Sequence, residues 1–263
     1  MSSKSLGAFS LGLLVLILLA CLFPGLLSPY QPNEIDFSRK FTPPGPEHWM
    51  GTDELGRDVF ARLLHGGRIT LGSALLIAAA STLGAAVWAG VSAYAGGLWD
   101  ELMTRMVDLL LILPGLLLAL LLVSLLEPGM GSLILALVIA RWPGYARILR
   151  GQIYSLLKEE YLLAAEAVGA RPMRIVWRHL LPNALVLILT VFGLSFASAI
   201  ISISSLSFLG FGVQLPTPEW GAMINAARPF LQTRPYLMVF PGAAVVITIL
   251  LTNLSLNVVE PEQ

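Results

Sequence analysis

Long apolar segments alternate with shorter polar segments along the chain of 263 residues. The first apolar run extends from about Leu6 to Leu27, and about 20 residues suffice to cross the hydrocarbon core of a bilayer. Five more runs of comparable length follow, at about 69–94, 102–126, 132–148, 183–209 and 236–256. The pattern predicts an all-α membrane protein with six transmembrane helices.

The same pattern divides the chain into four parts. These are a first transmembrane helix at 1–27, an external loop at 28–68, a five-helix core at 69–258 that includes a cytoplasmic loop at 150–182, and a short tail at 259–263. The first run has a second interpretation, because Lys4 followed by an apolar core also describes a secretory signal and Cys21 lies in an approximate lipoprotein cleavage box. The apolar run continues past Cys21, which favours a retained helix.

The external loop is expected to contain one short helix of its own. Several prolines keep its first half extended or looped. Thr52 or Asp53 is expected to cap an amphipathic helix, and Gly66-Gly67 to end it. We expect this helix to lie flat on the membrane surface, as an anchor or as a guide for substrate.

Two polar features inside the runs are candidates for function. Arg105 and Asp108 lie three positions apart at the start of the third run, which Pro114 interrupts, so they share a helical face and can pair. An ionisable residue in a span also suggests a substrate pathway. Serine hydroxyls in a span either form hydrogen bonds with their own backbone or with a neighbouring helix, or line a polar path. We favour pairing for the charged residues and helix packing for the serines, which are Ser195, Ser198, Ser202, Ser204, Ser205 and Ser207.

Residues 161–183 form a basic island between the fourth and fifth runs. The breakers Gly169 and Pro172 and the closing Leu181-Pro182 predict two short helices joined by a turn. With the amino terminus inside, nine of the 16 basic residues fall on the side of the island, among them Arg141, Arg147 and Arg150, and most of the others lie in the long early loop. Long loops carry little topological information, so the positive-inside rule places the island and both termini in the cytoplasm.

Composition supports this class and excludes several functions. The chain is 56% hydrophobic and 12% charged, and its mean hydropathy of +0.79 is typical of an integral membrane protein. Its net charge is zero and no basic patch is interleaved with aromatic residues, so no nucleic-acid partner is expected. The sequence has no phosphate-binding GxxxxGK[ST] loop and no HExxH pair. We therefore expect no catalytic residue, no metal site and no ATP hydrolysis on this chain.

The island resembles the cytoplasmic loop of binding-protein-dependent ABC importer permeases. The signature of that loop is Glu-Ala-Ala, three residues and Gly, followed after a gap by an apolar residue and Leu-Pro. The matching positions are Ala164, Ala165, Gly169, Leu180, Leu181 and Pro182. Leu163 stands where the family has the glutamate.

Three further segments resemble one group within that family, the dipeptide, oligopeptide and nickel permeases. They are the GTDELGRD segment at 51–58, the segment 105–114 with Arg-Met-Val-Asp and Pro114, and the late segment 207–221 with SFLGFG and PTPEWG. The resemblance extends from about residue 28 to 256.

This resemblance implies an importer-type ABC permease fold with a cytoplasmic coupling helix that docks on a separate ATPase. The implied function is that of a transmembrane permease subunit for peptides or for nickel or metal chelates, which moves substrate by alternating access. The resemblance assigns ATPase coupling to Ala164, Ala165, Gly169, Ala170, Arg171, Pro172, Met173, Arg174, Leu181 and Pro182. It leaves open whether the substrate is a peptide or a metal chelate.

The resemblance also implies partners. These are a second homologous permease subunit, two cytoplasmic ATPase subunits that use ATP and Mg, an external solute-binding protein and membrane lipid, in a bacterial or archaeal cell membrane. No cofactor is expected on this chain itself. The alternative from another class is a secondary carrier or channel that uses Asp108 and the serines of the fifth run as an ion path.

Overall fold

A computed structural model describes residues 3–156, 158–159 and 181–258, and these residues form helices and loops without a strand. The helices are α1 (Ser3–Leu22), α2 (Val59–Ala95), α3 (Gly97–Leu110), α4 (Gly115–Ser124), α5 (Met130–Leu156), α8 (Leu181–Phe208), α9 (Trp220–Ala227) and α10 (Tyr236–Ser255). Within the described ranges, five helices are long and apolar enough to cross a membrane, and a sixth span results if the bent pair α3 and α4 is one. The all-α class and the number of spans agree with the sequence prediction.

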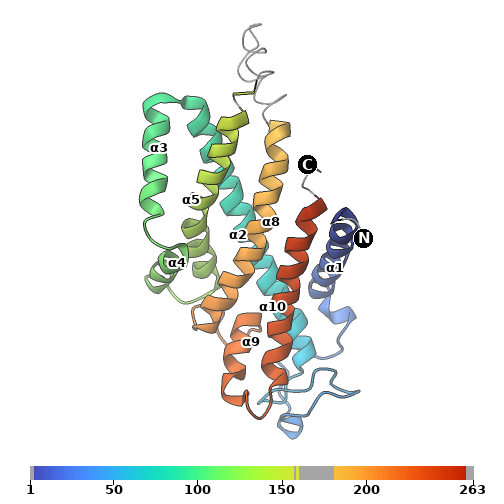
Figure 1. Cartoon of the computed structure of the whole chain (residues 1–263). Coiled ribbons are helices and arrows are strands. Elements are labelled where there is room, and N and C mark those ends of the chain that lie inside the picture. The colour runs from blue at the N-terminus through green and yellow to red at the C-terminus, as the bar shows by residue number, and fades with distance from the viewer. Residues whose placement is uncertain (1–2, 157, 160–180, 259–263) are drawn as a thin grey trace.

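The long helices α2, α5, α8 and α10 run along the length of the molecule, and α1 packs beside α10 and α2 (Figure 1). Helix α9 and the loop between α1 and α2 lie together at one end. Helix α5 ends and α8 begins at the opposite end (Figure 1). We call the first the loop end and the second the coupling end.

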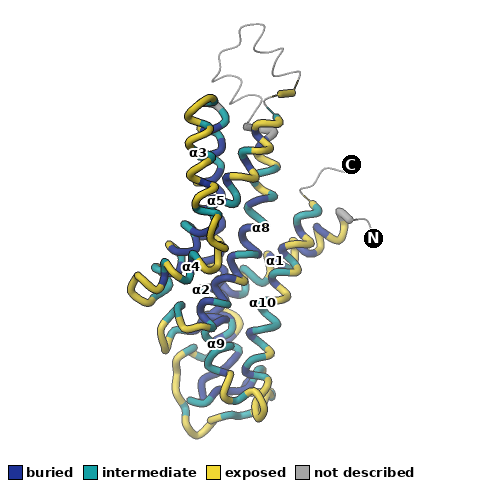
Figure 2. The backbone as a smooth tube through the Cα atoms, turned by 60° about the vertical axis from the view of Figure 1, so that its left-hand side comes forward, coloured by how far each residue is buried: buried dark blue, intermediate teal, exposed yellow. Residues whose placement is uncertain are grey.

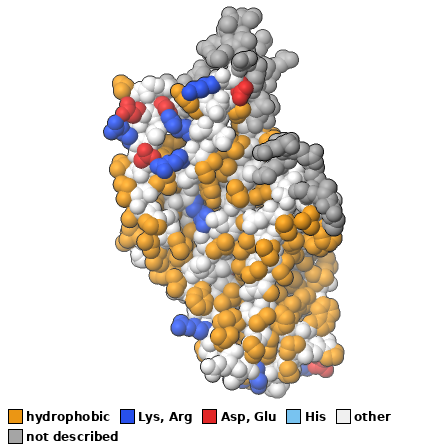
Figure 3. All heavy atoms as spheres, in the orientation of Figure 1, with side chains coloured by type: hydrophobic (Ala, Val, Ile, Leu, Met, Phe, Trp, Pro, Cys, Tyr) orange, Lys and Arg blue, Asp and Glu red, His pale blue; other side chains and the backbone are white. Residues whose placement is uncertain are grey.

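The main core lies between α2, α5 and α8. Leu71 and Ile77 of α2, Leu137 of α5 and Ile200 and Ile203 of α8 are almost fully buried. Many large apolar residues are exposed. Exposed positions are found along the outer faces of the helices (Figure 2). On the face drawn in Figure 3, acidic side chains are confined to the two ends and apolar side chains cover the length between them. This distribution is that of a protein surrounded by lipid.

The prediction of a separate short surface helix in the external loop is wrong. Helix α2 is continuous from Val59, and its cap is Asp58, whose Oδ1 accepts a hydrogen bond from the Ala61 amide at 2.6 Å. The span therefore begins ten residues before the predicted Ile69. Gly66 and Gly67 do not end the helix, because in lipid a helical backbone keeps its own hydrogen bonds where no other partner exists.

The two glycines instead permit close packing. A Cβ atom on Gly67 would collide with the Cys21 sulfur of α1 and lie 2.8 Å from a Trp220 ring carbon of α9. A Cβ atom on Gly66 would lie 3.3 Å from the Glu219 Cα. Small residues at such positions let helix backbones approach one another in membranes.

Gly67→Val is expected to lower the free energy of unfolding by about 1–3 kcal/mol, the usual cost of overpacking. Gly72→Val is the matched control, since Gly72 lies on the same helix and a Cβ there would meet nothing within 4 Å. Both changes alter helix propensity by the same amount. Thermal unfolding in detergent compares the two variants, and equal midpoints would show that the close packing at Gly67 is unimportant.

Other boundaries also differ from the sequence prediction. The third run is two helices bent by 75°, with Pro114 as the residue that precedes α4. Helix α5 continues through Pro143 to Leu156, eight residues past the predicted end at Ile148. The reason is that Ala146, Leu149 and Ile153 extend its buried face at helical spacing. The expected start of the cytoplasmic loop at residue 150 is therefore helical.

Candidate functional site

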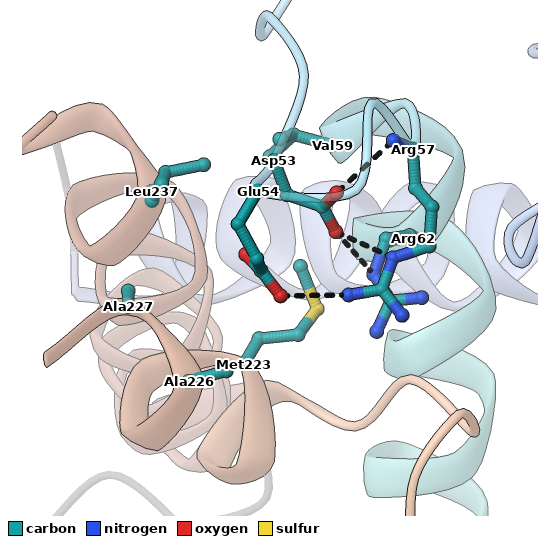
Figure 4. A pocket seen from close by; sticks show the side chains of 9 residues that line it. All are labelled: Asp53, Glu54, Arg57, Val59, Arg62, Met223, Ala226, Ala227 and Leu237. Atoms are coloured by element: carbon teal, nitrogen blue, oxygen red, sulfur yellow. Dashed lines mark hydrogen bonds and ion pairs between the residues drawn. The ribbon is translucent and has the colours of Figure 1, made fainter. Parts of the chain in front are cut away.

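The GTDELGRD segment folds into a compact lock at the loop end of the molecule. Asp53 Oδ1 accepts from the amides of Leu55 at 2.9 Å and Arg57 at 3.0 Å, and Arg57 Nε donates to Asp53 Oδ2 at 2.7 Å. Arg62 Nε of α2 lies 3.6 Å from the same carboxylate, and Arg57 also donates to Glu54 at 3.0 Å (Figure 4). Gly56 has a φ of +75°, and a Cβ there would collide with the Asp36 carbonyl.

The cavity beside this lock is too small for a transported solute. Its volume is about 30 Å³, and Met223 and Ala227 of α9 and Leu237 of α10 line its far side (Figure 4). That volume holds one or two water molecules. The lock therefore holds the loop against α2, and the cavity beside it has no room for a peptide.

A second, more polar hollow of about 230 Å³ lies within the loop, between Tyr30, Arg39 and His48. His48 Nδ1 lies 2.8 Å from Asp58 Oδ2, so the histidine is tied to the cap of α2. Nearby, the Ser38 hydroxyl donates to Asp36 at 2.6 Å and holds the pKa of that exposed carboxyl below its usual value. These contacts give the loop a defined shape.

The late PTPEWG segment is the joint between α9 and α2. Glu219 is fully buried and caps α9, since its carboxylate accepts from the amides of Gly221 at 3.0 Å and Ala222 at 2.9 Å. The Thr70 hydroxyl of α2 donates to the same carboxylate at 2.9 Å. Trp220 Nε1 donates to the Leu63 carbonyl at 2.9 Å. Two motifs far apart in the sequence therefore meet along α2.

Charged side chains at the coupling end connect three helices. Asp100 of α3 accepts from Arg150 Nε of α5 at 2.7 Å and from the Ser92 hydroxyl of α2 at 2.5 Å. Arg150 Nη2 makes a second bond to the same carboxylate, so the pair is bidentate. One turn before Arg150, Arg147 pairs with Asp108. These contacts fasten α3 to α5 beside the point where α5 ends.

The prediction that Arg105 pairs with Asp108 is wrong. Arg105 pairs with Glu101, at 2.5 Å and four residues away, and Asp108 pairs with Arg147. Cross-helix geometry decides the outcome, because α5 packs along α3 and offers Arg147 to Asp108. Both pairs are more than half exposed, which describes surface pairs and not a buried ion path.

Asp100→Ala is expected to lower the free energy of unfolding by about 1–3 kcal/mol, because the change leaves Arg150 without its bidentate partner. Asp108→Ala is the comparison, with an expected loss below about 1 kcal/mol for an exposed pair. The side chain of Asp100 is 16% exposed and that of Asp108 is 52% exposed. Thermal unfolding in detergent measures both, and a larger loss in Asp108→Ala would contradict the assignment.

Midway along α5, Arg141 reaches across to α8. Its Nη1 donates to the Ser198 hydroxyl at 2.6 Å and to the Tyr145 hydroxyl at 3.3 Å. Its Nη2 donates to the Ser198 carbonyl at 2.8 Å and to the Ser202 hydroxyl. Two of the serines therefore serve this arginine, and Ser195 bonds to Ser81 of α2 at 3.2 Å. The expected role in joining helices is confirmed for Ser195, Ser198 and Ser202, whereas the buried hydroxyls of Ser204 and Ser207 have no hydrogen-bond partner in the described part of the chain.

Most of the residues assigned to ATPase coupling, from Ala164 to Arg174, lie outside the described residues. Leu181 and Pro182 are the first two positions of α8. Proline is tolerated in the first turn of a helix because its missing N–H has no partner there. The structure therefore places the two ends of the loop, at α5 and α8, and the coupling assignment stays a prediction. Within the described part of the chain, no group of three or more His, Cys, Asp or Glu side chains could hold a metal ion.

Two known protein families have models that match this chain. Residues 82–262 match the model of the binding-protein-dependent transport system inner membrane component. The chain belongs to this family. Residues 2–44 match a second model, the N-terminal transmembrane domain of oligopeptide transport permease C. Membership and the number of apolar helices make the chain a multi-pass inner membrane protein of a transport system that uses a binding protein.

Individual relatives agree with this membership. The oligopeptide transport system permease protein OppC of Bacillus subtilis is 36% identical over 246 residues, which cover 94% of this chain and 81% of the relative. The glutathione transport system permease protein GsiD of Escherichia coli is 38% identical over 244 residues, 91% of this chain and 80% of the relative. Among solved structures, a chain of the inward-facing MetNI methionine ABC transporter has the same fold, with a TM-score of 0.59 and 16% identity over 76% of this chain and 96% of that chain.

Arg141 is a functional candidate that was not identified from the sequence. Arg141 was counted with the basic residues that orient the chain, although it lies within the fourth apolar run. The criterion that selected Asp108, an ionisable residue inside a span, applies equally to Arg141. The signal was therefore present, and only the packing of α5 on α8 shows what it contacts.

Proposed function

We propose that this chain is one permease subunit of an ATP-driven importer that carries peptides. The observation that supports this most is the similarity over more than nine-tenths of the chain to permeases named for oligopeptide and glutathione transport. Nickel and metal chelates are the second candidate, from the resemblance of the GTDELGRD segment. The peptide class is preferred because both relatives are named for peptides.

The coupling end is the part on which partner ATPases act. Helices α5 and α8 flank residues 157–180, so a force on that segment reaches both helices directly. Two ATPase subunits bind and hydrolyse ATP with Mg, and their closure moves the coupling helix around Gly169. The spans then change between inward-open and outward-open states, which requires that ATP favours one of them.

The complete assembly contains a second homologous permease subunit, the two ATPases, an external solute-binding protein and surrounding lipid. The coupling end and both termini face the cytoplasm in this arrangement, and the lock and the polar hollow face outward toward the binding protein. The charge distribution of the sequence supports this orientation, since the basic island joins α5 to α8.

A secondary carrier or channel is less well supported. That function requires Asp108 to sit on an ion path, but Asp108 is 52% exposed and paired with Arg147. Ser198 and Ser202 are engaged by Arg141.

Reconstitution in proteoliposomes separates the two functions. The importer predicts uptake of a labelled tripeptide that depends on ATP, on the binding protein and on the ATPase subunits. Uptake by the purified chain alone, driven by an ion gradient, would replace the importer with the carrier. Competition by unlabelled peptides or by a nickel chelate then identifies the substrate class.

A further inference from the structure

Arg141 carries a charge deep inside a membrane span. It lies about 16 Å from the start of α5 and about 22 Å from its end, at 1.5 Å per residue. The hydrocarbon core of a bilayer is about 30 Å thick. A charge at this depth is costly, and such residues usually mark a pathway for a substrate or an ion.

No described carboxylate pairs with this arginine. Its four bonds go to the Tyr145 hydroxyl, the Ser198 hydroxyl and carbonyl, and the Ser202 hydroxyl, all of which are neutral. Hydroxyls and a carbonyl accept from both Nη atoms but leave the positive charge uncompensated. In contrast, Arg105, Arg147 and Arg150 each have a carboxylate partner.

Helix packing alone does not require a cation here. The same bundle joins α2 to α8 with an uncharged pair, Ser81 and Ser195, at 3.2 Å. Helices α5 and α8 also share apolar contacts, to which Leu137 and Ile200 contribute. A guanidinium group adds two properties that serines lack, a permanent charge and a planar fork that matches a carboxylate.

The guanidinium is not fully enclosed by this chain. Arg141 and Tyr145 are both only partly buried, so their side chains are not sealed inside the bundle. Their position joins α5 to α8, the two helices that flank residues 157–180. A carboxylate that binds here competes with Ser198 and Ser202 for the arginine and acts on the contact between those helices.

We propose that Arg141 binds a carboxylate of the transported solute, such as the C-terminal carboxylate of a peptide, as the solute passes the middle of the membrane. The proposal rests on the proposed importer function and adds a chemical preference to it. The second source of a carboxylate would be the partner permease subunit, and the experiment distinguishes the two.

The test measures ATP-dependent uptake of trialanine and of trialanine amide, at concentrations that saturate the binding protein, by the complete reconstituted importer. In Arg141→Gln we expect the ratio of trialanine uptake to trialanine amide uptake to fall about tenfold or more. This is the effect expected from the loss of one charge-assisted hydrogen bond. Selection by the binding protein is the same in wild type and variant, so it cancels in the comparison. Arg141→Lys, which keeps the charge and loses the fork, is expected to give an intermediate ratio.

Arg105→Gln is the matched control, because it removes an arginine from an exposed pair and is expected to keep the wild-type ratio. An unchanged ratio in an intact Arg141→Gln assembly would overturn the proposal and leave Arg141 as a packing residue. Failure of Arg141→Gln to co-purify with the second permease would overturn it in favour of an intersubunit pair. Absence of ATP-dependent uptake of either peptide by the wild type would instead overturn the importer function and this inference with it.

Discussion

Replacement of Asp53 by alanine is expected to lower the free energy of unfolding by about 3–5 kcal/mol, the usual cost of removing one partner from a buried ion pair. The side chains of Asp53, Arg57 and Arg62 are 8%, 4% and 6% exposed. Without Asp53, Arg57 keeps the partly exposed Glu54 as a carboxylate partner, whereas the buried Arg62 keeps only neutral acceptors, which are oxygens of Pro32, Asn33 and Pro216. Thermal or chaotrope unfolding of the detergent-purified protein measures the loss.

Glu47→Ala is the control, because Glu47 is 79% exposed and lies 3.7 Å from Arg39, so its removal should cost less than about 1 kcal/mol. Asp53→Asn separates charge from shape, since asparagine still accepts from the Leu55 and Arg57 amides. We expect its stability to lie between wild type and Asp53→Ala. Equal stability of Asp53→Ala and Glu47→Ala would show that the lock contributes nothing.

Gly169→Asp is expected to reduce ATP-driven uptake by about tenfold or more while membrane insertion continues, because a bulky, charged side chain at the turn of the coupling helix blocks docking on the ATPase. The prediction rests on the proposed function. Uptake by the reconstituted importer, measured together with ATP hydrolysis by the same assembly, gives the result. Loss of uptake with continued hydrolysis is the expected signature of uncoupling.

Gly45→Asp is the matched control at the loop end of the molecule. A Cβ on Gly45 would meet no atom closer than 3.8 Å, so the same substitution there is expected to leave uptake near the wild-type level. Transport unchanged in Gly169→Asp, at equal amounts of protein in the membrane, would remove the coupling assignment from this turn.

The structure places the polar contacts of the chain at three levels. The lock around Asp53 and the joint at Glu219 hold the loop end to α2. The pair of Asp100 with Arg150 holds the coupling end of α3 to α5. Arg141 is the contact between α5 and α8 at mid-height. The two end contacts therefore hold helices together, and the middle one carries an uncompensated charge.

Several boundaries and pairs were decided only by tertiary packing. Gly66 and Gly67 look like helix breakers in the sequence, but they lie inside α2, where Cys21, Glu219 and Trp220 pack against them. Asp108 has a basic residue three positions away, but its partner is Arg147, 39 positions along the chain. Local spacing cannot predict these contacts, because they depend on which helices lie side by side.

By itself, the sequence determined the helical class, the apolar runs of the six predicted spans and the permease family, because a bilayer demands apolar runs of about 20 residues and because family motifs are local. It also predicted that the stretch from Ala164 to Pro182 is the coupling element, and this assignment stays a prediction. Only the tertiary structure decided the role of the GTDELGRD and PTPEWG motifs and the contacts of Arg141. The physical reason is that each of these depends on side chains from two or more helices, and the packing of those helices brings them together.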